Sequence, residues 1–325
     1  MKILSFNFIL VLSLFLYDEP HSASESHLKR TSSEDTAIIV EQVSRVLNEY
    51  YVYPEVAKAM ESFINIQMSN GAYQNAFTQQ KLIEELQSDL REISSDGHIS
   101  LHLANHSKDR RSQVLPRTEL QKQVHADFIS SGKATNKIGY LRFDKFSGDP
   151  QTKKLITEAM ISLAASNSLI IDMRENIGGD PNLVAFLSSY FVEDNTPLWS
   201  LIDRDGNEVL KVKSKVNNNK FNGKLYLLTS NKTYSAAEAF VYTLKHLGRA
   251  YIIGEPTGGG AHLVEMQRVT DDIDIRIPVL RAYNSVTESN WERNGVIPMI
   301  AVEASKAKSA AIKHIEKFTD ETRID

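Results

Sequence analysis

Apolar residues recur at helical spacing in the segment that follows residue 33. They are three or four positions apart in "EDTAIIVEQVSRVLNEYYVYPEVAKAMESFI" and again in "FTQQKLIEELQSDLREI". This spacing places them on one face of a helix, where they can be buried together. The pattern predicts a segment of three or more helices between about residues 33 and 95.

The pattern changes at "SSDGHISLHLANH", where Ile99, Leu101 and Leu103 alternate with polar residues after a Ser-Asp-Gly turn. A period of two predicts a strand. On a strand His98 and His102 would lie about 13 Å apart, at ~3.3 Å per residue, which is too far to share a metal ion. The chain also lacks an HExxH pattern. Local spacing therefore predicts no metal site, and no motif predicts a cofactor.

Strands and helices alternate from residue 138 onward. The predicted strands are 138–143, 168–173, 224–228, "AYIIGEP" and "DIDIRIPVLRAY", and the predicted helices lie within 150–165, 182–191 and "TYSAAEAFVYTLKHLG". The polar "KVKSKVNNNKFNG" predicts a surface loop. Such alternation favours an α/β layer with buried strands. We therefore expect a helical domain over 33–97 and an α/β core over 98–325.

The N-terminal sequence "MKILSFNFILVLSLFLYDEPHSASES" is typical of a secretory signal peptide. One lysine precedes an apolar stretch, and small residues surround Ala23 and Ser24. We expect residues 1–24 to be removed and the protein to be periplasmic or extracellular. The alternative is an uncleaved anchor, but the apolar run is shorter than the ~20 residues that span a bilayer. No later segment is apolar enough to span one.

The composition excludes several kinds of chemistry. A net charge of -4 over 325 residues, with no long run of one sign, gives no electrostatic footprint for nucleic acid. The absence of cysteine excludes thiol nucleophiles and thiolate metal sites. It also excludes disulfides, which the oxidising environment of exported proteins usually permits. A packed core must therefore supply the stability, and no pattern in the chain specifies an oligomeric state.

The helix in "TYSAAEAFVYTLKHLG" begins with a serine that allows two interpretations. Ser235 and Glu238 form a capping-box pattern, and Gly248 is a typical helix stop. The helix also follows an apolar strand directly, so Ser235 lies at a strand-to-helix turn. A helix N-terminus stabilises developing negative charge, as acyl transfer requires. The local pattern favours capping, whereas the position makes Ser235 a candidate nucleophile.

A glycine pair follows the predicted strand in "LIIDMRENIGGD". Gly178 and Gly179 are typical of a turn with positive φ. The functional alternative is a loop whose unhindered N–H groups line an anion pocket. Neither this segment nor the serine segment decides the matter alone.

Five segments together resemble the tail-specific, or C-terminal processing, serine protease family, in particular its branch related to interphotoreceptor retinoid-binding protein. They are "SDGHISL", "IGYLRFDKFSG", "LIIDMRENIGGD", "LLTSNKTYSAAEAFVYTLKHLGRAYIIGEPTGGGAH" and "NWERNGVIPMIAVE". The resemblance implies a Clp/crotonase-like α/β core, a spiral of β-β-α units, preceded by a small helical domain. It implies that Ser235 is the nucleophile, and that Ala236 and either Gly178 or Gly179 hold the oxyanion. A PDZ domain is not expected, because only about 40 residues separate His98 from "IGYLRF".

The chain departs from the lysine-dependent members of this family at the general base. The position of that lysine, 25 residues after Ser235, is Gly260. The tricorn branch instead uses a histidine and a late glutamate, and the matching positions here are His98 and Glu292. Histidine suits base catalysis near neutral pH when a carboxylate orients it. The simpler alternatives are a polar strand residue for His98 and a surface carboxylate for Glu292.

We therefore predict a secreted or periplasmic serine endopeptidase that hydrolyses polypeptides through an acyl-enzyme on Ser235, with His98 as base. The competing hypothesis is a non-catalytic carrier of a hydrophobic ligand, such as a retinoid or fatty acid, on the same fold. The missing lysine favours the carrier. The strand-turn-helix position of Ser235 and the presence of His98 favour the peptidase.

Overall fold

The computed structural model describes residues 31–76, 78–104, 124–130 and 137–321, so the predicted signal peptide lies outside the described residues. The helices are α1 (Ser33–Tyr50), α2 (Pro54–Ser69), the 3-10 helix η2 (Ala72–Asn75), α3 (Gln79–Ser94), α5 (Pro150–Ser162), α6 (Pro181–Ser188), α7 (Ala236–His246) and α8 (Ala304–Glu321). The strands are β1 (Ser100–Leu103), β2 (Val124–Ser130), β3 (Lys137–Phe143), β4 (Ser168–Asp172), β5 (Pro197–Ile202), β6 (Glu208–Lys213), β7 (Lys224–Thr229), β8 (Ala250–Gly254), β9 (His262–Thr270), β10 (Ile273–Tyr283) and β11 (Ile300–Ala301).

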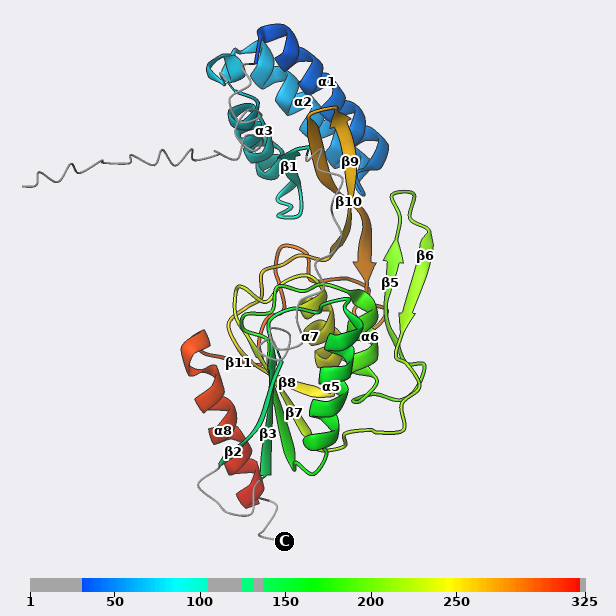
Figure 1. Cartoon of the computed structure of the whole chain (residues 1–325), viewed down its shortest axis with the longest axis vertical. Helices are drawn as coiled ribbons and strands as arrows, with labels where there is room; N and C mark the ends of the chain where they lie inside the picture. The colour runs from blue at the N-terminus through cyan, green and yellow to red at the C-terminus, as the bar shows by residue number, and fades with distance from the viewer. Residues whose placement is uncertain (1–30, 77, 105–123, 131–136, 322–325) are drawn as a thin grey trace, which may run out of the picture.

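The molecule is elongated, with α1 to α3 at one end and α8 at the other (Figure 1). Across the described ranges, no helix combines the length and the apolar character needed to cross a membrane.

The predicted helical segment is present and is completed by a hairpin from late in the chain. Helices α1, α2 and α3 bury their apolar faces in one cluster with residues of β1, β9 and β10, among them Leu47, Leu86, Leu101 and Ile275. The β9–β10 hairpin rises out of the core to reach the helices (Figure 1). The domain division at residue 97 remains a prediction. In the folded protein, residues of β9 and β10, far beyond residue 97 in the sequence, belong to the hydrophobic core of the helical part.

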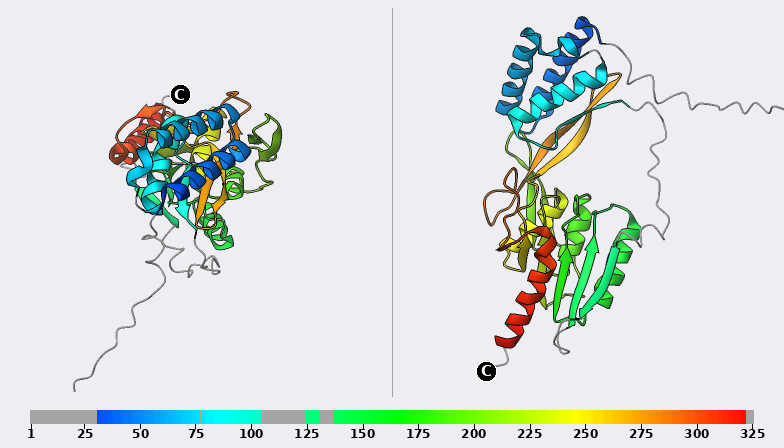
Figure 2. Two further views of the ribbon diagram at one scale, coloured as in Figure 1. Left: turned by 90° about the horizontal axis from the view of Figure 1, so that it is seen from above. Right: turned by 90° about the vertical axis from the view of Figure 1, so that its left-hand side faces the viewer.

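The α/β core is built on a six-stranded sheet with the strand order β11-β8-β7-β4-β3-β2. Strands β3, β4, β7 and β8 are parallel, and β2 pairs antiparallel to β3. Helices α5, α6 and α7 pack on one face, and α8 packs on the other (Figure 2). Every residue of β4 is buried, as the sequence predicts. Because β4 and β7 are parallel neighbours, the loops that follow them meet at the same edge of the sheet.

A second sheet joins the helical part to the core in the order β1-β10-β5-β6, with β9 paired to β10. The surface-loop prediction is wrong for Lys211 to Lys213, which belong to β6. That strand is almost wholly exposed and therefore lacks an alternating pattern. The predicted strand around Ile99 begins only at Ser100, and His98 lies in the turn before it.

Candidate active site

Ser235 adopts a strained backbone at the junction of β7 and α7. Its φ and ψ are 55° and −120°, whereas a helix N-cap residue normally has an extended conformation. The Tyr234 N–H donates to the Asn176 carbonyl (3.1 Å), and the Ser235 N–H donates to the Glu238 carboxylate (2.8 Å). These bonds hold Ser235 in a backbone conformation that costs about 1–3 kcal/mol. Residues with such strained conformations are concentrated at functional sites. A strained serine between a strand and a helix is typical of serine hydrolases.

The glycine turn after β4 lies directly against the serine turn. Gly178 has a φ of 90°, and a Cβ there would come 2.6 Å from the Tyr234 carbonyl oxygen and 2.8 Å from the Ala236 nitrogen. Asn176 fixes this loop, because its side chain accepts from the Gly178 N–H (2.9 Å) and donates to the Phe143 carbonyl (2.8 Å). Only glycine fits at position 178 without displacing the serine.

Two backbone N–H groups beside Ser235 have no acceptor among the described residues and are candidates to bind an oxyanion. The Gly178 N–H already donates to Asn176, which makes it unsuitable. Among the hydrogen bonds of the described residues, neither the Gly179 N–H nor the Ala236 N–H is a donor. Both residues line the cavity that contains Ser235. Of the predicted donors, Ala236 and Gly179 are therefore the pair that the geometry favours.

We expect Gly178→Ala to lower both stability and reactivity at Ser235. The matched control is Gly206→Ala, because Gly206 also has a φ of 90° but a Cβ there would meet nothing within 4 Å. The control should lose only the about 1–2 kcal/mol that a left-handed conformation costs an alanine. Thermal unfolding of the two variants measures the difference. Equal losses would contradict the close contact with the serine turn.

Glu238 connects the serine turn to the glycine-rich loop after β8. Its buried carboxylate accepts hydrogen bonds from the N–H groups of Ser235, Gly259 and Gly260 and from the Thr257 hydroxyl. Burial raises the pKa of Glu238 to about 7, and these hydrogen bonds partly oppose that rise. The capping-box pattern predicted only the Ser235 contact. Its wider role depends on a loop about twenty residues away in the chain.

Gly260 occupies the position at which the family resemblance predicts a lysine, and the space beside this glycine is filled. A Cβ at this position would come 2.6 Å from His98 Cε1 and 2.6 Å from the Tyr234 hydroxyl. The rings of His98 and Tyr234 pack with centroids 4.9 Å apart. The absence of a side chain at Gly260 thus makes room for the imidazole of His98.

His98 belongs to a buried cluster with Asp96, His262 and Glu292. Asp96 Oδ1 lies 3.3 Å from His98 Nδ1, and Asp96 Oδ2 lies 2.6 Å from His262 Nδ1. Glu292 Oε2 lies 3.6 Å from His262 Nδ1 and accepts from the Ala261 N–H (2.6 Å). Sequence reasoning missed Asp96 and His262. The Ser-Asp-Gly-His turn places Asp96 next to His98, but nothing local indicates His262.

The electrostatics of the two carboxylates differ. Burial alone would raise the pKa of Asp96, but the hydrogen bond with His262 and the interaction with His98 outweigh it, so this pKa is well below its usual value. Burial raises the pKa of Glu292, with partial opposition from His262. Asp96 is therefore the carboxylate better suited to a permanent negative charge beside the imidazoles.

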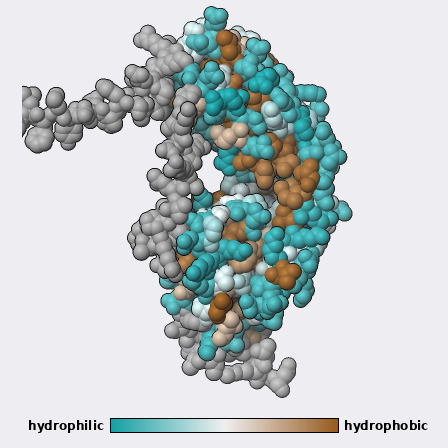
Figure 3. All heavy atoms as spheres, turned by 45° about the vertical axis from the view of Figure 1, so that its right-hand side comes forward, coloured by the Kyte–Doolittle hydropathy of each residue, from teal (hydrophilic) through white to brown (hydrophobic). Residues whose placement is uncertain are grey.

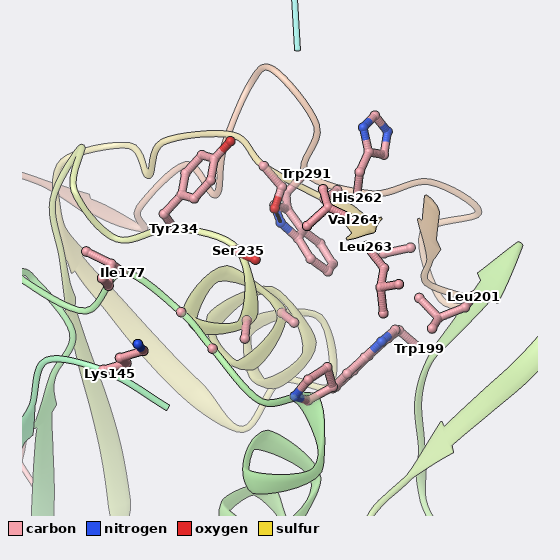
Figure 4. Close-up of a pocket in the computed structure, with 18 of the residues that line it drawn as sticks. Lys145, Ile177, Trp199, Leu201, Tyr234, Ser235, His262, Leu263, Val264 and Trp291 are labelled. Atoms are coloured by element: carbon pink, nitrogen blue, oxygen red, sulfur yellow. Dashed lines mark hydrogen bonds between the residues drawn. The ribbon is translucent and has the colours of Figure 1, made fainter. Parts of the chain in front are cut away.

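Ser235 opens into a cavity of about 590 Å³, whose lining includes His262 but not His98. Figure 4 shows the ring of His262 and the hydroxyl of Tyr234 pointing away from Ser235. The apolar residues of the lining include Ile177, Trp199, Leu201, Leu263, Val264 and Trp291. Hydrophobic surface also gathers at the middle of the molecule, between the helical part and the core (Figure 3). The structure thus brings His98 together with Glu292, but it does not place His98 in hydrogen-bond contact with Ser235 within the described residues.

Comparison with known proteins places the chain in a family. Residues 137–302 match peptidase family S41, and residues 31–132 match the N-terminal domain of this family in eukaryotic IRBP. The chain belongs to peptidase family S41. The carboxyl-terminal-processing protease of Picosynechococcus sp. is 22% identical over 166 residues, which are 51% of this chain and 39% of that protein. The chain spans less than half the length of the curated relatives it matches.

Two solved structures have the same fold. A putative peptidase from Parabacteroides merdae has a TM-score of 0.61 at 19% identity and covers 84% of this chain and 90% of its own. The tricorn protease has a TM-score of 0.61 at 14% identity, over 90% of this chain and 37% of its own. They confirm the predicted fold class, an α/β core of the S41 and tricorn type with a helical segment before it.

Proposed function

We propose that the protein is a serine endopeptidase in which Ser235 attacks the carbonyl carbon of a peptide bond. The observation that carries the proposal is the strained serine itself, at a helix N-terminus and beside the N–H groups of Ala236 and Gly179, which have no acceptor among the described residues. Membership of family S41 supports the same reaction. We further propose that the protein acts in the periplasm or outside the cell, on the basis of its N-terminal sequence.

In the proposed reaction His98 removes the proton from the Ser235 hydroxyl as the serine oxygen bonds to the substrate carbon. The N–H groups of Ala236 and Gly179 bind the oxyanion of the tetrahedral intermediate. His98 then gives its proton to the leaving amine as the C–N bond breaks. In the second half His98 takes a proton from water, whose oxygen bonds to the acyl carbon, and gives it to the Ser235 oxygen as the acid product leaves. Asp96 and Glu292 orient the imidazole. Catalytic contacts in unliganded sites commonly tighten only with substrate, so substrate binding would bring His98 to Ser235.

The substrate we propose is a partly unfolded or tail-exposed polypeptide whose apolar side chain enters the cavity. Trp199, Leu201 and Leu263 offer the apolar surface for such a side chain. The competing function is a carrier of a hydrophobic ligand, which the same apolar lining favours. The two functions differ in whether Ser235 is reactive.

Labelling with a fluorophosphonate tests this difference. The wild-type protein should be labelled, and Ser235→Ala should lose at least about 99% of the label because the nucleophile is absent. The control is Ser32→Ala, since Ser32 is also an N-cap serine and its hydroxyl accepts from the Asp35 N–H. That variant should label like the wild type. No labelling of the wild type, together with tight fatty-acid binding, would instead support the carrier.

A further inference from the structure

Four potential metal ligands meet beside the Ser235 cavity, and one of them, His262, lines it. Asp96 and His98 precede β1, His262 begins β9, and Glu292 follows β10. One ligand atom from each of the four lies within 4.8 Å of all the others. We propose that these side chains bind a divalent transition-metal ion, with Zn²⁺ as the best match, and that the bound ion prevents His98 from acting as a base. The inhibitory part rests on the proposed function, whereas the metal site does not.

Two of the separations between possible ligand atoms are close to those of a tetrahedral zinc site. Bonds of about 2.1 Å in a tetrahedron place neighbouring ligand atoms about 3.4 Å apart. Asp96 Oδ1 lies 3.3 Å from His98 Nδ1, and His262 Nδ1 lies 3.6 Å from Glu292 Oε2. Asp96 Oδ2 lies 2.6 Å from His262 Nδ1, which is a hydrogen bond that a metal ion would have to replace. Binding of an ion would therefore open the Asp96–His262 hydrogen bond and draw together ligand atoms that already lie within 4.8 Å of one another. Local spacing could not predict it, because His262 is 166 residues away from Asp96.

A second observation is that the imidazoles carry unpartnered nitrogens. His98 and His262 are only 1% and 5% exposed. Within the described part of the chain, Nε2 of both histidines has no hydrogen-bond partner, and Nδ1 of His98 has none beyond the ion-pair contact with Asp96 at 3.3 Å. Buried polar atoms are normally paired, and each exception requires an explanation. A metal ion would supply the missing partner, because two histidines and two carboxylates in one cluster can all bind the same ion.

The ligand types and their support favour zinc over calcium or magnesium. Two imidazoles with two carboxylates suit Zn²⁺, whereas calcium and magnesium prefer oxygen ligands alone. Both carboxylates are held from outside the cluster: the Tyr51 hydroxyl donates to Asp96 (3.1 Å), and the Ala261 N–H donates to Glu292 (2.6 Å). Such contacts orient metal ligands.

A bound ion would inhibit the proposed peptidase by coordinating His98, its general base. Four protein ligands complete a tetrahedral zinc site, which leaves no position for an activated water. The ion would instead tie His98 to Asp96, His262 and Glu292, and a coordinated imidazole is not free to approach Ser235. Removal of the metal would release it.

Titration calorimetry of the full chain, treated with a chelator and then dialysed, tests the metal site without any assay of activity. We expect one Zn²⁺ per chain, and visible absorption of Co²⁺ typical of a tetrahedral site. His262→Ala and Glu292→Gln should each weaken Zn²⁺ binding by more than about 100-fold, since even changes outside the ligand set cost 10–100-fold. The control is His102→Ala, because His102 is an exposed histidine bonded to Ser100 on β1. It should bind Zn²⁺ like the wild type.

The outcomes separate the two parts of the proposal. Absent binding, or binding that survives in both His262→Ala and Glu292→Gln, overturns the metal site; circular dichroism shows whether each variant is folded. If zinc binds, saturating Zn²⁺ should abolish fluorophosphonate labelling and a chelator should restore it. Labelling that is indifferent to bound zinc overturns the inhibitory role. If the metal-free protein is never labelled, the proposed peptidase fails while the metal-binding result stands.

Discussion

His98→Ala should lower peptide hydrolysis by about 10⁴-fold or more, which is the size of effect seen when a catalytic-triad member is removed. The imidazole is the only base that the proposed mechanism supplies to Ser235, and its loss leaves the serine hydroxyl protonated. The measurement is turnover of a fluorogenic unfolded protein, with a chelator present so that metal binding does not contribute. Thermal unfolding shows that the variant is folded.

Two other histidines make this experiment specific. His102→Ala should retain wild-type turnover, because His102 is exposed on β1. His262→Ala should reduce turnover by a smaller factor than His98→Ala, since in the proposed mechanism His262 holds Asp96, to which it is bonded, and His98 is the base. Undiminished turnover in folded His98→Ala would overturn the assignment of the base, and a complete loss in His262→Ala alone would transfer it to His262.

Glu238→Gln should destabilise the fold by about 2–6 kcal/mol and abolish labelling at Ser235. One carboxylate oxygen accepts from Ser235 and Gly260, and the other accepts from Thr257 and Gly259. The glutamine N–H₂ group would face at least one of these pairs of donors, whichever way the amide is turned. Each buried donor left without an acceptor costs about 1–3 kcal/mol. Denaturant unfolding measures the loss.

The control is Glu158→Gln, the same substitution at an exposed position of α5. The stability of this variant should stay within about 0.5 kcal/mol of the wild type.

The pH dependence of stability provides a second test of the role of Glu238. The pKa of Glu238 in the folded protein, about 7, is above its ordinary value of 4.5, so the folded state binds this proton more tightly than the unfolded state. Its contribution to stability is therefore complete below about pH 4.5 and is lost as the pH rises through about 7. Glu238→Gln should lack this decline, and an unchanged decline would contradict the assignment to Glu238.

The sequence predicted the elements whose signal is local. The apolar spacing in α1 and α3 and the short apolar run of β4 identify their secondary structure without reference to the rest of the chain. Strand β6 was missed because its exposed residues do not alternate between apolar and polar. The β9–β10 hairpin was not assigned to the helical part, because its burial there depends on helices about 200 residues earlier.

The same distinction holds for the candidate site. The sequence by itself determined that Ser235 lies at a strand-to-helix turn and that a glycine pair follows another strand, since both are patterns of neighbouring residues. Only the tertiary structure decided that these turns touch, because parallel pairing of β4 with β7 brings their ends to one edge. It also decided that Gly260 leaves room for His98 and that His262 joins Asp96. Contacts between segments so far apart in the chain arise from packing, which no local pattern of side chains encodes.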